Sequence, residues 1–226
     1  MLKFYYSLAP NPMKVALFLE EAGLEYDAIP VDTRKGDQFK PAFVALNPNS
    51  KVPCIVDGDA VVFDSNAILL YLAEKTGQFL PANTPAMRGE LLSWLMFVAS
   101  GVGPYSGQAV HFTHHAPKPN EYAAKRYAFE AKRHYGILDA RLSQHAYMVG
   151  EAYTIVDMAV WGWARMAPFV LGEQAWAELP HLKRLTDEVS ARPATAKALA
   201  LKDLHAFKTE MDDEARSNMF RHTAAA

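Results

Sequence analysis

Residues 2–23, LKFYYSLAPNPMKVALFLEEAG, decide the fold of the first part of the chain. Residues 2–7 are rich in aromatic and apolar side chains, which is typical of a strand. Residues 13–22 follow the Pro10-Asn11-Pro12 turn with an apolar helical pattern, and Gly23 stands where helices commonly end. This stretch therefore predicts a strand, a turn and a helix.

The next fifty residues add the other elements of a small mixed domain. Asp57-Gly58 is a turn signal between two short apolar runs, and Asp64-Ser65 can cap a following helix. The predicted elements are a strand over 26–32, a short helix over 39–46, a hairpin over 52–56 and 60–63, and a helix over 66–77. The order is a βαβ unit followed by two strands and a helix.

The composition changes after residue 80, where LPANTP (80–85) is typical of a linker. Strand signals are scarce beyond it, and apolar residues recur at helical spacing. The predicted helices cover 87–100, 119–142, 154–169, 180–191 and 194–206. We therefore expect a first domain over 1–80 and an all-helical domain over 87–206. Residues 207–226 lack a sustained apolar period, which suggests a loosely held tail or a partner-facing extension.

Composition excludes several classes of function. The chain has 226 residues, 50% of them apolar, and a formal net charge of −2, so no basic field favours nucleic acid. The sequence shows no signal peptide and no apolar run long enough for a membrane span, so we expect a cytoplasmic protein. The single cysteine, Cys54, excludes an internal disulfide and reads as a buried apolar residue. His111, His114 and His115 lack supporting ligands, and no metal is predicted.

Asn11 is the most informative candidate for chemistry. It precedes Pro12, and proline is favoured at the first position of a helix, so Asn11 is predicted to be the N-cap. Its amide could then donate to a thiolate bound in front of the helix. Lowering a thiol pKa from about 8.5 to about 6.5 takes about 2.7 kcal/mol, and a helix N-terminus with one hydrogen bond to a charged acceptor can supply about that much. Simple capping remains the alternative reading.

Two further motifs could hold a peptide-like ligand. Val52 precedes Pro53 and is therefore pushed toward an extended conformation, in which its backbone N–H and C=O can pair with a peptide. Asp64 and Ser65, at the start of a helix, offer a carboxylate, a hydroxyl and backbone N–H groups, which suit the α-amino and α-carboxylate groups of an amino acid. An ordinary helix cap is the alternative for this pair.

Together these motifs resemble the cytosolic glutathione transferases, in which APNP (9–12), KVP (51–53) and DSNAILLYL (64–72) occur in this order. The resemblance covers residues 1 to about 206 and is closest to the Nu class. Further matching segments are LFLEE (17–21), GDQF (36–39), AILLYLAEKTG (67–77), GP (103–104), GQ (107–108), HF (111–112) and RPA (192–194). It implies an α+β fold, with a thioredoxin-like N-terminal domain followed by an all-helical glutathione-transferase C-terminal domain. It also implies a homodimer, a cis Val52–Pro53 bond and a glutathione site between the domains.

By position, the resemblance also assigns roles to individual residues. Asn11 resembles the asparagine that hydrogen-bonds the glutathione sulfur, and Val52 with Pro53 resembles the segment that pairs with the cysteinyl backbone. The remaining implied contacts are Asp64 and Ser65 for the γ-glutamyl group, Gln38 and Lys51 for the glycyl end, and Arg133 from the helical domain. Ala9 departs from the pattern, because relatives often carry a threonine hydroxyl there, although Ser7 offers another hydroxyl nearby.

The expected function is that of a glutathione-dependent enzyme. The site would bind glutathione, stabilise its thiolate and direct the sulfur at a disulfide or a small electrophile, without any metal. The alternative is a catalytically weak glutathione-binding regulatory protein on the same fold, which the loss of a hydroxyl at Ala9 favours. An isomerase or dehalogenase on this scaffold would need a cysteine or serine where Asn11 stands.

Overall fold

The computed structural model describes residues 1–221, and the chain divides into two compact units. The first unit comprises Met1–Tyr71 together with the chain from Ala194 onward, and the second comprises Leu72–Pro193. These units depart from the domains that the sequence suggested, 1–80, 87–206 and 207–226, chiefly because the last long helix joins the first unit.

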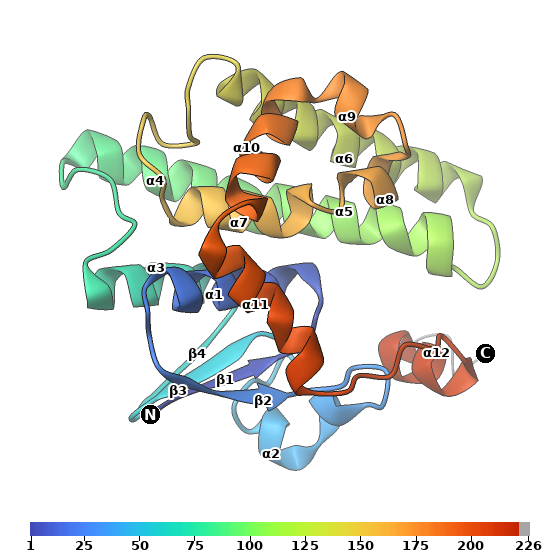
Figure 1. Ribbon diagram of the computed structural model, residues 1–226. Coiled ribbons are helices and arrows are strands. Elements are labelled where there is room, and N and C mark those ends of the chain that lie inside the picture. The colour runs from blue at the N-terminus through green and yellow to red at the C-terminus, as the bar shows by residue number, and fades with distance from the viewer. Residues whose placement is uncertain (222–226) are drawn as a thin grey trace. The chain divides into compact units, whose positions relative to one another are not determined.

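A four-stranded mixed sheet forms the centre of the first unit (Figure 1). Its strands are β1 (Leu2–Tyr6), β2 (Tyr26–Pro30), β3 (Cys54–Asp57) and β4 (Ala60–Phe63), in the order β2-β1-β3-β4. Strands β1 and β2 are parallel and are joined through helix α1 (Pro10–Glu21), whereas β3 is antiparallel to both β1 and β4. Together with the helical second unit, this sheet confirms the predicted α+β fold.

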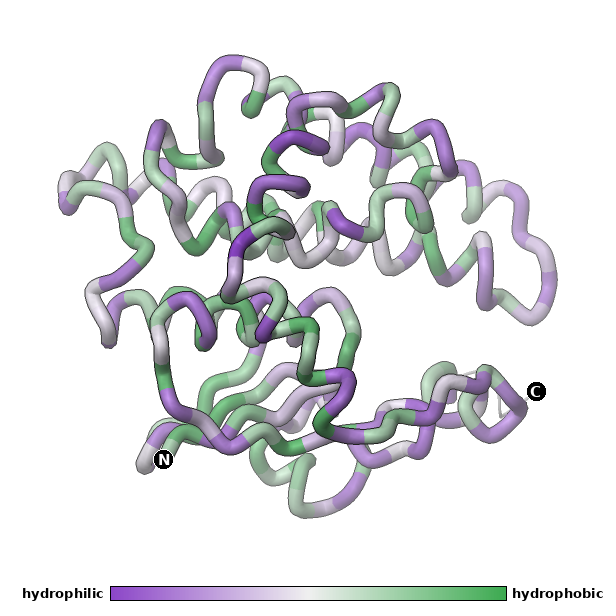
Figure 2. The backbone as a smooth tube through the Cα atoms, in the orientation of Figure 1, coloured by the Kyte–Doolittle hydropathy of each residue, from purple (hydrophilic) through white to green (hydrophobic). Residues whose placement is uncertain are grey.

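Both faces of the sheet are covered within the first unit. Helix α1 and the start of α3 (Ser65–Thr76) lie over one face, and the short helix α2 (Pro41–Val44) lies over the other (Figure 1). All eight residues of α1 from Pro12 to Leu19 are buried, and hydrophobic stretches recur along the strands of the sheet in Figure 2. On the α2 side, Phe43 packs in one cluster with Cys54 and Tyr5.

The strand register brings four chain segments to one end of the sheet. Tyr6 pairs with Pro30, so the chains leaving β1 and β2 emerge together. Tyr5 pairs with Cys54, so the segment entering β3 meets the chain leaving β1. Cys54 pairs with Phe63, so the start of α3 lies at this end as well. Every site residue predicted within residues 1–80 belongs to the segments that begin or end here, except Gln38.

The second unit, Leu72–Pro193, contains helices and no strand. Its helices are α4 (Pro85–Phe97), α5 (Gly103–Val110), α6 (Glu121–Leu142), α7 (Ile155–Ala164), α8 (Ala167–Leu171), α9 (Ala175–Glu178) and α10 (Pro180–Ser190), with π-helical segments η2 (Val98–Val102) and η3 (His111–His115). The predicted helix over 154–169 divides into α7 and α8, because Pro168 occupies the first turn of a new helix. Thr154 and Asp157 form a capping box at the start of α7.

The chain after the second unit returns to the sheet. Helix α11 (Pro193–Leu204) is fixed there by Tyr6, whose hydroxyl donates to the Leu201 carbonyl at 3.1 Å and lies 3.0 Å from His205 Nδ1. A further helix, α12 (Asp213–Met219), follows. Residues 207–221, for which the sequence suggested a loosely held tail or a partner-facing extension, thus include a helix, while residues 222–226 of that tail lie outside the described part.

No helix within residues 1–221 is long and apolar enough to cross a membrane.

Candidate functional site

A cavity of about 220 Å³ lies in the first unit at the end of the sheet where the four segments meet. It contains three of the predicted site residues, Gln38, Lys51 and Val52. The other lining residues are Ser7, Ala9, Thr33, Phe39, Asn49, Ser50 and Met219. Three of the four segments and the C-terminal helix thus contribute to one cavity.

The start of α1 differs from the prediction. Helix α1 begins at Pro10, and Ala9 is the N-cap residue with no side-chain cap. Asn11 is therefore the second helical residue, and its prediction as the N-cap is wrong. Ala9 is extended, with φ of −68° and ψ of 161°, as the residue before a proline commonly is, and the fixed φ of Pro10 suits the first position of the helix.

The two prolines of this turn limit the backbone N–H groups that can donate hydrogen bonds at the start of α1. Pro10 and Pro12 have no N–H, so Asn11 supplies the backbone N–H of the first three helical residues, in addition to its side-chain amide. The Ser7 hydroxyl accepts a hydrogen bond from the Ala9 N–H at 3.4 Å, and Ser7 is buried at the cavity wall. Ser7 therefore places a hydroxyl beside the position where Ala9 has none.

The loop before β3 is held by Asn47, a residue that was not predicted from the sequence. Its side-chain amide donates to the Lys51 carbonyl at 2.6 Å, and its side-chain oxygen accepts from the Asn49 N–H at 3.0 Å. Asn47 is only 1% exposed, so these bonds form inside the protein. The Val52–Pro53 bond that follows is cis, as predicted. The Lys51 side chain is exposed at the cavity, whereas Pro53 is buried.

Asp64 caps helix α3 as its pattern predicted. Its Oδ1 accepts hydrogen bonds from the N–H groups of Asn66, at 2.9 Å, and Ala67, at 3.1 Å. The backbone of Asp64 is left-handed, with φ of 73°, a conformation that aspartate tolerates better than most residues. This geometry leaves the Asp64 side chain at the surface and places Ser65, which is 4% exposed, in the first turn of the helix.

Lys14 is a buried residue of α1 that contacts Ser65 at the start of α3. It is 1% exposed, and its ammonium donates to the Ser65 hydroxyl at 3.4 Å, the single hydrogen bond described for it. Burial lowers the pKa of Lys14 to about 7, while the nearby Asp64 carboxylate opposes that change. Lys14 thus connects the buried helix α1 to the start of α3. The signal for it was a lone lysine inside an apolar helix that is buried on all sides.

Gln38 sits in a 3₁₀ turn, η1 (Asp37–Phe39), and is only 4% exposed. Its side-chain nitrogen donates to the carbonyls of Thr33, at 3.2 Å, and Asn218, at 3.4 Å. Its side-chain oxygen is buried without a hydrogen-bond partner among the described residues, as is that of Asn66. Buried polar atoms of this kind usually have a partner, so both mark places that a polar ligand could complete.

Arg133 belongs to the second unit, on α6. Its side chain is about half exposed, and its Nε donates to Glu130 Oε2 at 3.0 Å. This hydrogen bond lowers the pKa of the Glu130 carboxyl, which is also paired with Arg126. Arg133 therefore shares one carboxylate on its own helix with Arg126.

Cys54 cannot serve as a ready nucleophile. It is fully buried in β3, and burial raises the pKa of its thiol to about 11. A thiol in that state is almost entirely protonated near neutral pH. Among residues 1–221, moreover, no group of three side chains is arranged to hold a metal ion.

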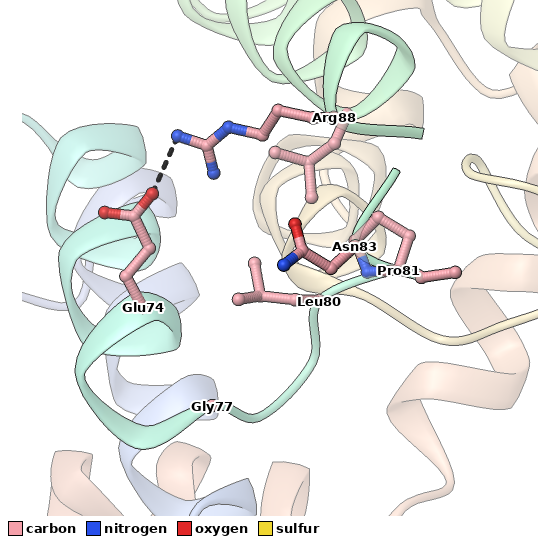
Figure 3. A pocket seen from close by; sticks show the side chains of 8 residues that line it. Glu74, Gly77, Leu80, Pro81, Asn83 and Arg88 are labelled. Atoms are coloured by element: carbon pink, nitrogen blue, oxygen red, sulfur yellow. Dashed lines mark ion pairs between the residues drawn. The ribbon is translucent and has the colours of Figure 1, made fainter. Parts of the chain in front are cut away.

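The second unit has a pocket of its own, of about 540 Å³ (Figure 3). An ion pair between Arg88 and Glu74, 2.7 Å long, reaches across it, and the predicted linker forms one wall. The lining residues are Glu74, Gly77, Leu80, Pro81, Ala82, Asn83, Arg88 and Leu91. None of the predicted site residues lines this pocket, and its only charged side chains neutralise each other.

Comparison with known proteins identifies the family. A model of the glutathione S-transferase N-terminal domain matches residues 9–75, and one of the glutathione S-transferase C-terminal domain matches residues 101–193. The disulfide-bond oxidoreductase YfcG of Escherichia coli K12 is 40% identical over 228 aligned residues, which cover 95% of this chain and 98% of that protein. The chain belongs to the glutathione transferase family. The family resemblance predicted from the sequence is thereby confirmed.

Solved structures of related transferases support the assignment. A glutathione transferase from Burkholderia graminis, with two glutathione molecules bound per subunit, is 36% identical and has a TM-score of 0.82, covering 88% of this transferase and 87% of that chain. One from Pseudomonas putida, with one glutathione disulfide bound per subunit, is 36% identical with a TM-score of 0.81, covering 88% and 90%.

Proposed function

We propose that this glutathione transferase binds glutathione in the first unit, stabilises its thiolate and uses it to reduce disulfides by thiol–disulfide exchange. The observation that carries this proposal is a cluster of polar ligand-binding segments without a protein nucleophile. Asn11, Val52 and Ser65 lie on segments that meet at one end of the sheet, while Cys54 is buried and protonated. The reactive sulfur must therefore come with the ligand. The relative YfcG is a disulfide-bond oxidoreductase by name, and the related structures hold glutathione or glutathione disulfide, which supports the same chemistry.

The chain offers a different kind of contact to each part of the tripeptide. The Val52 backbone beside the cis bond suits the cysteinyl backbone, and Asp64 and Ser65 suit the γ-glutamyl ammonium and carboxylate. Lys51 supplies a positive charge for the glycyl carboxylate, and Gln38 lines the same end. We assign Lys14 the role of positioning Ser65. Arg133 is proposed as a contribution from the helical unit.

Asn11 would stabilise the sulfur in its ionised form. Its side-chain amide and its backbone N–H both lie in the first turn of α1, where the helix dipole favours an anion. A hydrogen bond to a charged acceptor contributes about 1.5–3 kcal/mol, and the dipole about 0.3–1 kcal/mol. Their sum can lower a thiol pKa by about two units, which needs about 2.7 kcal/mol. The Ser7 hydroxyl is a further donor at this wall.

The proposed reaction balances with two molecules of glutathione. The bound thiolate attacks one sulfur of the disulfide, forms a mixed disulfide with it and releases the other sulfur as a thiolate. A second glutathione thiolate then attacks the mixed disulfide, which releases the second product thiol and forms glutathione disulfide. The rate depends on the thiolate fraction of the attacking sulfur and on the pKa of the leaving thiol. Conjugation to a small electrophile would use the same thiolate.

We further propose Nu-class membership, a homodimer and a cytoplasmic location. The Nu-class proposal rests on the matching segments of the sequence, and the dimer on the resemblance to cytosolic transferases. A reducing compartment fits a protein whose single cysteine is unpaired and whose co-substrate is a thiol.

One observation favours a second candidate function, a catalytically weak glutathione-binding regulator. Ala9 leaves the first turn without the hydroxyl that relatives often carry there, so sulfur activation would depend on Asn11 and Ser7. Binding of glutathione without turnover of any disulfide or aryl halide would support this candidate.

A side-by-side assay of disulfide reduction and aryl conjugation tests the proposal, with wild type compared with Asn11→Ala. We expect measurable disulfide reduction in the wild type and a loss of at least about tenfold in the variant, because one hydrogen bond to a charged group is worth about 1.5–3 kcal/mol. Glutathione affinity, measured by calorimetry, should change much less. Equal turnover by both proteins would remove Asn11 from the mechanism.

A further inference from the structure

We propose that the C-terminal segment, residues 207–221, forms a wall of the glycyl subsite and selects thiol peptides that end in glycine. This inference deepens the proposed function and rests on its assignment of Gln38 and Lys51 to the glycyl end. The cavity that holds both residues is also lined by Met219, from the last turn of α12.

The segment is anchored at its start by charge-assisted hydrogen bonds. Lys208 donates its backbone N–H to Asp32 Oδ2 at 2.7 Å, and its carbonyl accepts from Arg34 Nη1 at 2.7 Å. Asp32 is 6% exposed and also accepts the Arg34 N–H through Oδ1, at 3.1 Å. These bonds fix the direction in which the chain leaves α11. The segment therefore runs beside the loop that follows β2.

The end of α12 is fitted to the turn that carries Gln38. Asn218 donates its side-chain amide to the Arg34 carbonyl at 2.9 Å, and its own carbonyl accepts from Gln38. Gly36 has φ of +80°, which favours glycine, and a Cβ built there would lie 2.9 Å from Asn218 Oδ1, so a side chain at this position would have to displace the Asn218 side chain. The turn and the end of α12 therefore pack closely at Gly36.

This fit also sets the orientation of the Gln38 amide. Its nitrogen faces two carbonyl oxygens, those of Thr33 and Asn218, so the flipped amide would place oxygen against oxygen. These two hydrogen bonds consequently oppose a movement of the Gln38 side chain that would make room for a larger ligand. Beyond α12, the Arg221 guanidinium lies 4.3 Å from the centre of the Phe39 ring, and Phe39 also lines the cavity.

These contacts predict sensitivity to the size of the ligand's C-terminal residue. Glycine is the smallest such residue, and a closely fitting pocket discriminates against one additional methylene by about 10–200-fold. Met219 is the side chain that the segment itself places in the cavity, so it should set much of this limit. Shortening it to alanine would leave space for a longer residue without removing any hydrogen bond described above.

The test compares glutathione with γ-glutamylcysteinyl-β-alanine, which has one more methylene in its last residue, in wild type, Met219→Ala and Met211→Ala. Met211 is a matched control, because it is a partly buried methionine of the same segment that does not line the cavity. We would measure kcat/KM for disulfide reduction and, independently, the Kd of each peptide by calorimetry. Wild type and Met211→Ala should prefer glutathione by at least about tenfold. Met219→Ala should lower this preference at least about threefold, through tighter binding of the longer peptide.

Two results would overturn the inference: equal use of both peptides by the wild type, or an unchanged preference in Met219→Ala. Either would leave the proposed function intact, provided that the wild type binds glutathione and reduces disulfides. A wild type that binds neither peptide would instead contradict the proposed function, and the selectivity with it.

Discussion

The two units each bury a charged side chain near the start of a helix, but the two side chains differ in how many hydrogen bonds compensate the buried charge. In the helical unit, Asp157 is 0% exposed, and it accepts hydrogen bonds from Met148 N and Thr154 N, both at 2.8 Å, and from Thr154 Oγ1 at 3.1 Å. In the first unit, Lys14 is 1% exposed and has one hydrogen bond of 3.4 Å to Ser65.

The difference separates a structural charge from one that is positioned for function. Burial of an ion is costly unless hydrogen bonds replace the lost water, and Asp157 has such bonds at both oxygens. Lys14 has donors in excess of its described partner, and it lies beneath Ser65, a proposed anchor of the γ-glutamyl carboxylate. We therefore expect Asp157 to matter for stability and Lys14 to matter for binding.

The largest expected effect is that of Asp157→Ala on stability. The substitution leaves the buried donors of Met148 and Thr154 without an acceptor, and each such donor costs about 1–3 kcal/mol. The free energy of unfolding, measured by denaturant titration, should fall by about 3–5 kcal/mol. Glutathione affinity of the folded fraction should stay within about twofold. A loss below about 1 kcal/mol would mean that the hydrogen bonds of Asp157 do not stabilise the helical unit.

Lys14→Met should show the opposite pattern. Replacing a poorly compensated buried ammonium with an apolar side chain of similar length is neutral or stabilising, so the free energy of unfolding should not fall by more than about 1 kcal/mol. The KM for glutathione should rise about tenfold at unchanged kcat, because Ser65 loses its hydrogen-bond donor and the site loses a positive charge.

Lys3→Met is the matched control for that variant, because Lys3 is exposed on β1. It should leave both KM and stability unchanged. A destabilised Lys14→Met protein with normal glutathione affinity would make Lys14 a structural charge like Asp157 and remove the contrast between the units.

The pH dependence of stability should distinguish the same two groups by its sign. The pKa of Lys14 is lowered from 10.5 to about 7 by burial, so between these values the unfolded chain binds more protons and stability rises with pH. The pKa of Asp157 is raised from 3.8 to about 6, again by burial, so stability falls as pH rises between those values.

Each contribution is limited to about 1.4 kcal/mol per pH unit. Denaturant titrations of wild type and Lys14→Met from pH 7 to 10 should show a rise in stability that the variant lacks. Parallel curves would place the titration of Lys14 outside this range and contradict the effect of its burial.

The sequence predicted the elements of the fold more reliably than the details of the site. The strand, turn and helix of residues 2–23 were correct because their apolar periods coincide with their burial. Asn11 was assigned two positions too early in the helix, because Pro12 and not Pro10 was taken as the first helical residue. No local sequence pattern predicts the π-helical segment over 98–102.

The remaining site residues depend on contacts between distant segments. Lys14 and Ser65 are 51 residues apart in the sequence. Gln38 donates to the carbonyl of Asn218, which is 180 residues away, so no local pattern relates the members of either pair. The role of the C-terminal segment was missed for the same reason, because its weak apolar period indicates little about docking through hydrogen bonds. Asn47 could have been found from its Asn-Pro-Asn-Ser context, in which an asparagine side chain commonly organises a turn.

The central claim, a glutathione thiolate held at the start of α1, is tested most directly by titrating the bound thiol. Thiolate absorbance near 240 nm, followed against pH for the complexes of wild type and Asn11→Ala, reports the pKa of the sulfur itself. A pKa about two units below that of an ordinary thiol in the wild type, moving back toward about 8.5 in the variant, is the expected result. An ordinary thiol pKa in the wild-type complex, or the same lowered value in both proteins, would contradict it.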